Sequence, residues 1–419
     1  MQMSQLPSNL PSADVSPHDR FPYWLNRPRI DKESFFGRES DLKAIDAAVQ
    51  GHRAVVLYGG TGYGKTRLAA EYTRFARCQG FWINAGDSVS QTLVQLASDL
   101  NVKTAGLDGV GVVREVKAEI RQLPIGTLWV VDNLDDLVQV NALLTDLAST
   151  KLLVTTRDNR YSVLAPSVKT IRLDVLDTTS AVALLCSRSE WNPRDLTLKK
   201  IAESVGNLPL ALEMLAVQLS SPGREPGTVL AALHRDLNPL QLRRFRETEG
   251  FSVTRSEGGV FAAITGALSR LSSDSRDRLS TLGYIADAPV PLALFESLTG
   301  LEGDGTERIC EECGRQSIIA RTGSQNRIHS LTVAAINATN AEGALATAAS
   351  RGVVRLARIN TDDPVALREE IMHHERILGH ARHALGDEHP QVTGYTNNLA
   401  IGYRALGRDT DAASLESGV

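Results

Sequence analysis

The feature that most constrains the fold of this chain is a glycine-rich turn between an apolar run and a helical pattern. Residues 53–59 are "RAVVLYG", the turn "GTGYGKT" follows, and "RLAAEY" continues with helical spacing. Glycines in such a turn let successive backbone N–H groups converge on one anion, and the N-terminus of the following helix adds positive potential. The stretch therefore predicts a strand, a phosphate-binding loop and a helix, in that order.

Residues 59–66 match the pattern G-x-x-x-x-G-K-[ST] in full. We expect Lys65 to reach the β- and γ-phosphates of a nucleotide, and the hydroxyl of Thr66 to bind Mg²⁺. The predicted nucleotide-binding residues of this stretch are Gly59, Gly60, Thr61, Gly62, Tyr63, Gly64, Lys65, Thr66 and the adjacent Arg67.

A second acidic element of such a site is expected at the end of a neighbouring strand. "LWVVDN" supplies Asp132 after four apolar residues, and its carboxylate is expected to hold Mg²⁺ through water. Asn133 follows, where many hydrolytic P-loop ATPases have an acidic base, and an asparagine cannot take a proton from water. The pair Asp132–Asn133 therefore predicts slow hydrolysis.

Apolar runs alternate with helical patterns between residues 35 and 175. The expected strands cover 53–59, 80–86, 128–133, 151–157 and 170–175, and the expected helices cover 65–78, 88–100, 112–123 and 134–149. Strand–helix alternation is typical of a parallel sheet with helices on both faces. We expect a P-loop nucleotide-binding domain here, preceded by an arm or linker over 1–34.

The rest of the chain is predicted to be mostly helical. Four short helices are expected over 176–240, and helices followed by two strands joined by "TGSQ" predict a winged helix within 241–338. Residues 339–419 are expected to be a helical linker and the start of tetratricopeptide-like repeats. There Leu399, Ala400 and Tyr403 would form an inner face that ends at Gly407. Because such repeats need neighbours, we expect more of them beyond Val419.

Composition excludes some functions. The formal net charge is -4, so the chain has no general attraction for nucleic acid or anionic membranes. The sequence has no apolar run of membrane-spanning length and no secretory signal at its start, so we expect a cytoplasmic protein. "CEEC" at 310–313 is expected to place two cysteines on one helix face rather than to bind zinc. The histidines of 373–383 are expected on a solvated helix face.

Six motifs in order carry a resemblance to a known family. They are the P-loop, "FFGRE" (35–39), "VVDN" (130–133), "LLVTTR" (152–157), "GNLPLALEML" (206–215) and "RIHSL" (327–331). Together they resemble the NB-ARC family of STAND NTPases, which includes plant disease-resistance proteins, apoptotic protease-activating factors and bacterial regulators. The resemblance covers about residues 35–338, and the C-terminal helices are similar to those of bacterial members with tetratricopeptide sensors.

The resemblance implies nucleotide contacts outside the P-loop. Phe36, Gly37 and Arg38 would flank the adenine and ribose, although "ESDL" also makes this stretch a lead-in to a helix. Arg157 would sense the γ-phosphate from a strand end, or else be a surface arginine. Pro209 would pack on the adenine, and it would also start a helix, since both roles are compatible.

The resemblance also implies that His329 contacts the β-phosphate of ADP, although a lone histidine is more often structural. Plant members follow this histidine with aspartate, whereas Ser330 follows it here. The difference weakens any role for the side chain after the histidine.

The resemblance implies a signalling switch that ADP holds closed. ADP/ATP exchange would open it, a signal ligand on the repeats would trigger the exchange, and the opened chains would self-associate. Two alternatives stay open. A turnover ATPase is disfavoured by Asn133, and a transcription regulator is disfavoured by the net charge, although "LRRFRETEGFSVTR" (242–255) is basic.

Overall fold

The computed structural model describes most of the chain. The described residues are 24–25, 35–76, 80–84, 97, 100, 102–103, 109–123, 126–134, 150–157, 168–234, 238–249, 257–286, 288–322, 325–340, 343–358 and 364–417. The helices predicted over 88–100 and 134–149 lie outside these ranges, apart from a few of their residues, as does nearly all of the predicted arm over 1–34.

A six-stranded parallel sheet forms the N-terminal body, which we call the α/β body. Its strands are β1 (Trp24–Leu25), β2 (Ala54–Tyr58), β3 (Gly80–Asn84), β4 (Leu128–Asp132), β5 (Lys151–Thr156) and β6 (Val168–Arg172). Their order across the sheet is β1-β3-β4-β5-β2-β6, and all neighbours run parallel. The five predicted strands are confirmed. The pattern did not predict β1, since two residues are too few to show a period.

Helices cover both faces of this sheet. α1 (Glu39–Gly51) and α2 (Lys65–Phe75) pack on one face, and α4 (Gly109–Ile120) packs on the other. Alternate residues of β2 divide between the two cores: Val55 and Leu57 face α1 and α2, whereas Ala54 and Val56 face the core of α4. Successive side chains of a strand point to opposite faces, so a central strand covered on both sides is apolar throughout.

Four short helices follow the sheet, and we call them the helical unit. They are α6 (Thr178–Cys186), α7 (Leu196–Ser204), α8 (Pro209–Leu219) and α9 (Pro226–Leu233), each close to its predicted position. Asp177 and Asp195 cap α6 and α7 by accepting backbone N–H bonds from Ser180 and Thr197. Pro209 and Pro226 each occupy the first helical position, where a missing N–H costs nothing.

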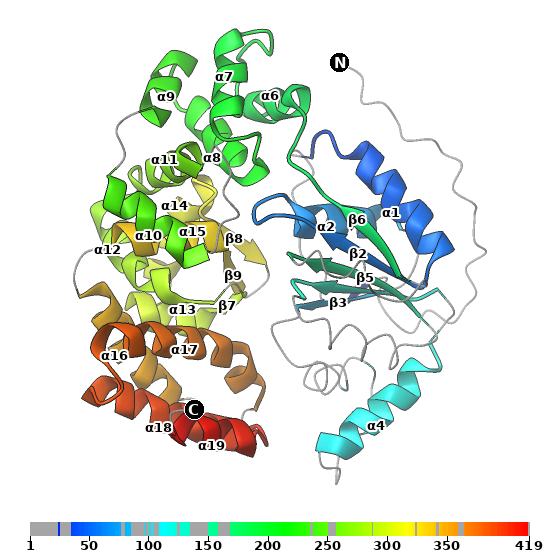
Figure 1. Ribbon diagram of the computed structural model, residues 1–419, viewed down its shortest axis with the longest axis vertical. Coiled ribbons are helices and arrows are strands. Elements are labelled where there is room, and N and C mark those ends of the chain that lie inside the picture. The colour runs from blue at the N-terminus through cyan, green and yellow to red at the C-terminus, as the bar shows by residue number, and fades with distance from the viewer. Residues whose placement is uncertain are drawn as a thin grey trace.

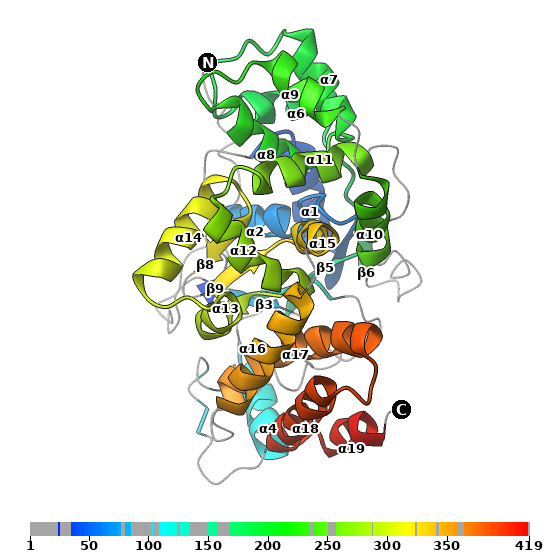
Figure 2. The ribbon, with the colours of Figure 1, turned by 90° about the vertical axis from the view of Figure 1, so that its left-hand side faces the viewer.

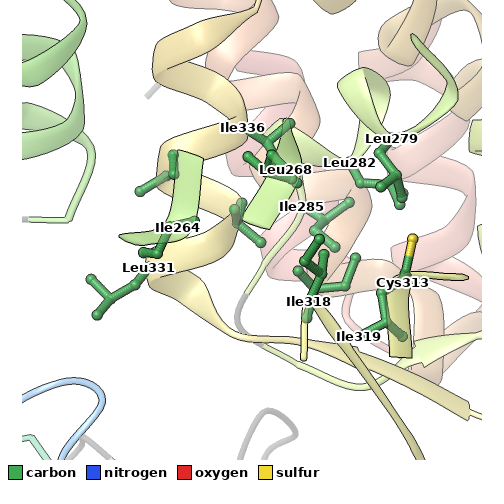
Figure 3. Packing of buried hydrophobic residues seen from close by; sticks show 14 of the residues in the cluster. Ile264, Leu268, Leu279, Leu282, Ile285, Cys313, Ile318, Ile319, Leu331 and Ile336 are labelled. Carbon is green, nitrogen blue, oxygen red and sulfur yellow. The ribbon is translucent and has the colours of Figure 1, made fainter. Parts of the chain in front are cut away.

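A three-stranded antiparallel sheet with helices forms a third part, which we call the hairpin unit. It contains α11 (Glu257–Leu268), α12 (Ser273–Leu279), the 3₁₀ helix η3 (Ser280–Tyr284), β7 (Val290–Pro291), α13 (Leu292–Thr299), α14 (Asp304–Arg315), β8 (Ile319–Thr322), β9 (Gln325–Ile328) and α15 (Ser330–Thr339). The predicted β8–β9 hairpin is present, and β7 adds to its β9 edge. Figure 3 shows side chains from α11, α12, α14, β8 and α15 meeting in one core.

The hairpin unit also tests the cysteine prediction. Cys310 and Cys313 lie one turn apart on the buried face of α14. The pair therefore packs as small apolar side chains. α10 (Pro239–Glu249) lies between the helical and hairpin units and packs beside α15.

The C-terminal helices are α16 (Ala344–Arg358), α17 (Pro364–Leu385), α18 (Pro390–Ala405) and α19 (Asp409–Ser417). The predicted inner face of α18 is buried at Leu399, Ala400 and Tyr403. Past the end of α18, Gly407 has φ +70°, and the N–H of Arg408 donates to the carbonyl of Tyr403 at 2.8 Å. This left-handed glycine ends the helix as expected.

The prediction of a solvated histidine face on α17 is wrong for two residues. His373 and His374 are 0% exposed. His374 Nδ1 lies 2.6 Å from the hydroxyl of Tyr395 on α18, and His373 Nε2 lies 3.0 Å from the carbonyl of Pro289 in the hairpin unit. The helix α18 and the segment at Pro289 cover these side chains, and a single-helix pattern does not reveal such contacts.

The units form two columns. Figure 1 shows the sheet on one side, with the helical unit, the hairpin unit and the C-terminal helices following one another along the other side. The perpendicular view in Figure 2 shows the same succession from end to end. Among the described helices, none combines the length and apolar character needed to cross a membrane.

Candidate functional site

The P-loop connects the end of β2 to the start of α2. Gly62 and Gly64 have φ +81° and +89°, a region that side chains other than glycine rarely adopt. Lys65 begins α2 and is 9% exposed. Its ammonium donates to the carbonyls of Gly59 at 2.9 Å and Gly60 at 3.0 Å, so it is held over the loop. The turn and the helix start have the backbone arrangement expected of a phosphate-binding loop.

Asp132 lies beside this loop at the carboxyl end of β4 and is 0% exposed. Its Oδ1 accepts hydrogen bonds from the hydroxyl of Thr66, at 2.8 Å, and from the hydroxyl of Thr155 on β5. Its Oδ2 accepts from Arg327 Nη1 of β9 at 3.1 Å. A buried carboxylate is stabilised only when hydrogen bonds and a counter-charge replace water, and these three groups supply both.

Asn133 turns the chain away from the strand. Its φ is +65°, which asparagine adopts more readily than most residues. Its backbone N–H donates to Thr155 Oγ1 at 2.9 Å, and the N–H of Leu134 donates to the carbonyl of Thr155 at 2.9 Å. Thr155 therefore fixes both Asp132 and the turn after it.

Arg38 holds the backbone of the P-loop through hydrogen bonds. It is 8% exposed, and its Nη2 donates to the carbonyls of Tyr63 at 3.0 Å and Asp174 at 2.7 Å. Its Nη1 pairs with Asp41 at 3.1 Å. Arg38 thus ties the P-loop backbone to the segment after β6, which the sequence did not predict.

The tip of the P-loop contacts the two units that follow the α/β body. A Cβ placed on Gly62 would lie 3.3 Å from methyl carbons of Leu208, before α8, and of Leu331, on α15. Leu208 and Leu331 are 5% and 0% exposed. Figure 3 shows Leu331 at the edge of the core of the hairpin unit. The predicted phosphate loop therefore lies where the α/β body, the helical unit and the hairpin unit meet.

His329 is the N-cap residue of α15. Its Nδ1 accepts a hydrogen bond from the N–H of Leu331 at 3.2 Å. An imidazole that accepts at Nδ1 carries its proton on Nε2 when neutral, so Nε2 is a donor. The histidine thus has a local structural role. It lies at the start of α15, two residues before Leu331, whose methyl carbon would be 3.3 Å from a Cβ at Gly62.

The remaining predicted residues lie around this loop as follows, and their contacts with a nucleotide stay predictions. Phe36 is half-buried against the core shared by the helical and hairpin units. Gly37 has φ +65° and lies so close to Ser180 of α6 that a Cβ would collide with it. Pro209 is half-buried at the start of α8. Arg157 follows β5 with an exposed side chain.

Arg67, on the first turn of α2, acts electrostatically on Glu213 of the helical unit. Burial raises the pKa of the Glu213 carboxyl on α8, and the positive charges of Arg67 and Arg188 act in the opposite direction. The positive charge of Arg67 on α2 therefore acts on a carboxyl group of α8.

The oxygen atoms present suit a magnesium ion. Mg²⁺ prefers hydroxyl, carboxylate and phosphate oxygens, and Thr66 Oγ1 and Asp132 Oδ1 lie 2.8 Å apart beside the phosphate cradle. These two residues would hold the ion, which would supply charge compensation for phosphate oxygens.

Sequence reasoning missed four residues of this site: Thr155, Arg327, Leu208 and Leu331. Thr155 and Arg327 lie in motifs that were singled out for Arg157 and His329. A threonine at the end of the strand next to Asp132 was a usable signal, since parallel strands end together. The partners of Arg327 and the two leucines lie in other units, so no local pattern pointed to them.

The sheet, its P-loop and the acidic strand end define the class: this is the P-loop NTPase fold, a parallel α/β sheet accompanied by many helices. Solved structures give the comparison within that class. The chain is similar to a signal transduction ATPase with numerous domains (STAND) that has a tetratricopeptide repeat sensor, from Pyrococcus horikoshii. The TM-score is 0.55 at 15% identity, over 94% of this chain and 59% of that one.

Other similarities are weaker. The Walker-type ATPase of Pyrococcus abyssi gives a TM-score of 0.38 at 14% identity, over 74% of this chain and 98% of that one. The Aeropyrum pernix Orc1 protein, solved in complex with DNA, gives 0.37 at 18% identity, over 73% and 92%. No protein-family model and no curated protein matches the chain. The chain spans somewhat more than half of the Pyrococcus horikoshii protein, and the likeness extends to the fold alone.

Proposed function

We propose that this chain is a nucleotide-dependent signalling switch of the NB-ARC type among STAND NTPases. The α/β body would bind ADP at residues 59–66, and the helical unit and a winged helix, the hairpin unit, would close over it. The observation that carries the proposal is the convergence of three units on one loop, since a Cβ at Gly62 would lie 3.3 Å from methyl carbons of both Leu208 and Leu331. A ligand bound there would be held by groups from separate parts of the chain.

The proposed closed state follows from differential binding. A ligand shifts a two-state equilibrium only as far as it binds one state more tightly. In the closed chain, Lys65 would contact the diphosphate from the α/β body, and the Nε2–H of His329 would donate to it from the hairpin unit. When the hairpin unit swings away, the diphosphate loses the second contact, so ADP favours closure.

The proposal assigns slow hydrolysis to this site. Asn133 lacks a carboxylate that could accept a proton from water. Its backbone N–H donates a hydrogen bond to Thr155 Oγ1. The C-terminal helices would be the beginning of a repeat sensor, which His373 links directly to the hairpin unit at Pro289. A signal on the sensor would loosen this contact, permit exchange of ADP for ATP, and allow opened chains to assemble.

The test is the nucleotide content of the purified chain. The supernatant of the heat-denatured chain should yield ADP by anion-exchange chromatography, and that of Lys65→Ala should yield little or none. Lys43→Ala, which removes a lysine of α1 outside the loop, is the matched control and should keep its ADP. A chain with no bound nucleotide, or a Lys65→Ala chain with unchanged ADP, would contradict the proposal. Several ATP turnovers per second would instead favour a motor-like ATPase.

A further inference from the structure

An ion pair between Arg327 and Asp132 joins the hairpin unit to the α/β body. The two residues are 195 positions apart, and Nη1 lies 3.1 Å from Oδ2. The Asp132 side chain is 0% exposed and that of Arg327 is 25% exposed. Because the carboxylate is fully buried, removal of the arginine would leave a buried charge without its counter-charge. That loss costs more free energy than the loss of one partner of a surface ion pair.

The hydrogen bonds around Asp132 divide its two oxygens between the two units. Oδ1 is bound within the α/β body, by Thr66 and Thr155. Oδ2 is bound by Arg327 from β9. Thr66 and Asp132 are also the residues that fit a magnesium ion, so the guanidinium stands at the same carboxylate that the ion would use.

We propose that Arg327 is the resident cation of Asp132 in the closed chain, and that closure by the hairpin unit and binding of a divalent cation at Asp132 oppose each other. This inference rests on the proposed function, because it assumes that the loop holds a nucleotide. A guanidinium and a hydrated Mg²⁺ are both positive, and both need the buried carboxylate. If both were bound at once, the two positive charges would repel each other beside a fully buried carboxylate, where water screens the repulsion little.

Two consequences follow from linkage. Coupling between two binding events is reciprocal, so if the attached hairpin unit weakens the cation, the cation weakens attachment. Arg327 also lies two residues before His329 on the same chain segment. Loss of the ion pair therefore moves the proposed diphosphate contact as well. Mg²⁺ should accelerate the release of ADP from this chain, whereas a cation that only bridged protein and diphosphate would slow it.

The experiment uses the whole chain loaded with ADP that carries a fluorescent methylanthraniloyl group. Its release is followed by stopped flow against excess unlabelled ADP, in EDTA and in a series of Mg²⁺ concentrations. For the unmodified chain, we expect saturating Mg²⁺ to raise the release rate by a factor within the roughly 5- to 150-fold range of site-to-site coupling. An equal or lower release rate in Mg²⁺ would overturn the inference, and this arm needs no variant.

Variants assign the effect to the arginine. Arg327→Met should abolish or reverse the Mg²⁺ effect, whereas Arg327→Lys should keep part of it because it keeps the charge. Arg315→Met removes an exposed arginine of the same unit that pairs with Glu311, and it should behave as the unmodified chain. An unchanged Mg²⁺ effect in Arg327→Met would also overturn the inference.

Direct cation binding gives a readout that does not depend on nucleotide release. Free Mn²⁺ counted by electron paramagnetic resonance should show tighter binding to ADP-loaded Arg327→Met than to the unmodified chain, and Asp132→Asn in addition should remove the gain. Equal affinities would count against the inference. A chain that binds no ADP would overturn both this inference and the proposed function, whereas ADP binding with the opposite Mg²⁺ effect would overturn the inference alone.

Discussion

Substitution of Gly62 by alanine tests whether the tip of the P-loop presses against the two other units. Gly62 has φ +81°, and a left-handed conformation costs an L-residue about 1–2 kcal/mol. The new methyl would also lie 3.3 Å from Leu208 and Leu331, which is closer than side chains normally approach. Overpacking of this kind costs about 1–3 kcal/mol.

Gly64 provides a matched control on the same loop. Its φ is +89°, so alanine meets the same backbone strain, but no atom of the described residues lies within 4 Å of a Cβ placed there. The difference between Gly62→Ala and Gly64→Ala therefore isolates the contact with Leu208 and Leu331. Because each 1.4 kcal/mol is a factor of ten, the expected difference of about 1–3 kcal/mol is a roughly 5- to 150-fold weaker affinity for ADP.

The assay is the dissociation constant for fluorescent ADP, measured for both variants by equilibrium titration. Hydrogen exchange of the first turn of α15 should rise more in Gly62→Ala than in Gly64→Ala, since that turn carries Leu331. Equal affinities and equal exchange for the two variants would show that the loop does not bear on the other units.

Two further predictions concern histidines. His329→Ala should weaken ADP more than ATP and should also destabilise the start of α15, where a lost N-cap costs about 1 kcal/mol; isothermal titration with each nucleotide checks this, and His329→Asn, which keeps an N-cap acceptor, separates the two effects. Acid should destabilise the C-terminal helices, because burial lowers the pKa of His380 from 6.5 to about 4 and also lowers that of buried His374. The unfolded chain binds these protons first, so this stability is complete above pH 6.5 and is lost as the pH falls toward 4. Thermal unfolding across that window should show a falling Tm, and a constant Tm would contradict the assignment.

Glu370 reinforces the same dependence on pH. Burial alone would raise the pKa of its carboxyl, but the neighbouring His374, at 3.5 Å, and the hydrogen-bonded guanidinium of Arg355 more than offset this, and the pKa is lowered. A carboxyl of this kind stabilises the fold above its ordinary pKa and loses that contribution as the pH falls. We therefore take the carboxylate as ionised against Arg355 and the buried His374 as neutral.

Much of the α/β body was predictable because its determinants are local. Residues 54–58 are apolar throughout, so they fit only a strand that is covered on both faces, and the following glycines require a loop with left-handed turns. Asp132 was predictable for the same reason, since a carboxylate directly after four buried residues must lie at a strand end. The four helices of the helical unit were likewise located from their own apolar spacing and breaks.

Prediction failed where a residue is defined by what another part of the chain places against it. His373 and His374 lie in a helix whose own pattern suggested a solvated face, and they are buried because α18 and the segment at Pro289 cover them. Likewise β1, only two residues long, is a strand because it pairs with the edge of β3. Neither case leaves a periodic signal in the segment itself.

Backbone geometry and burial period depend on neighbouring residues, so the printed residues were enough to locate the phosphate loop, the acidic strand end and the succession of strands and helices along the chain. The pairing of Arg327 with Asp132, and the packing of Leu208 and Leu331 beside the position of Gly62, became visible only in the folded chain. Those contacts join segments far apart in the chain, and their partners follow from how the units pack, which no local spacing encodes.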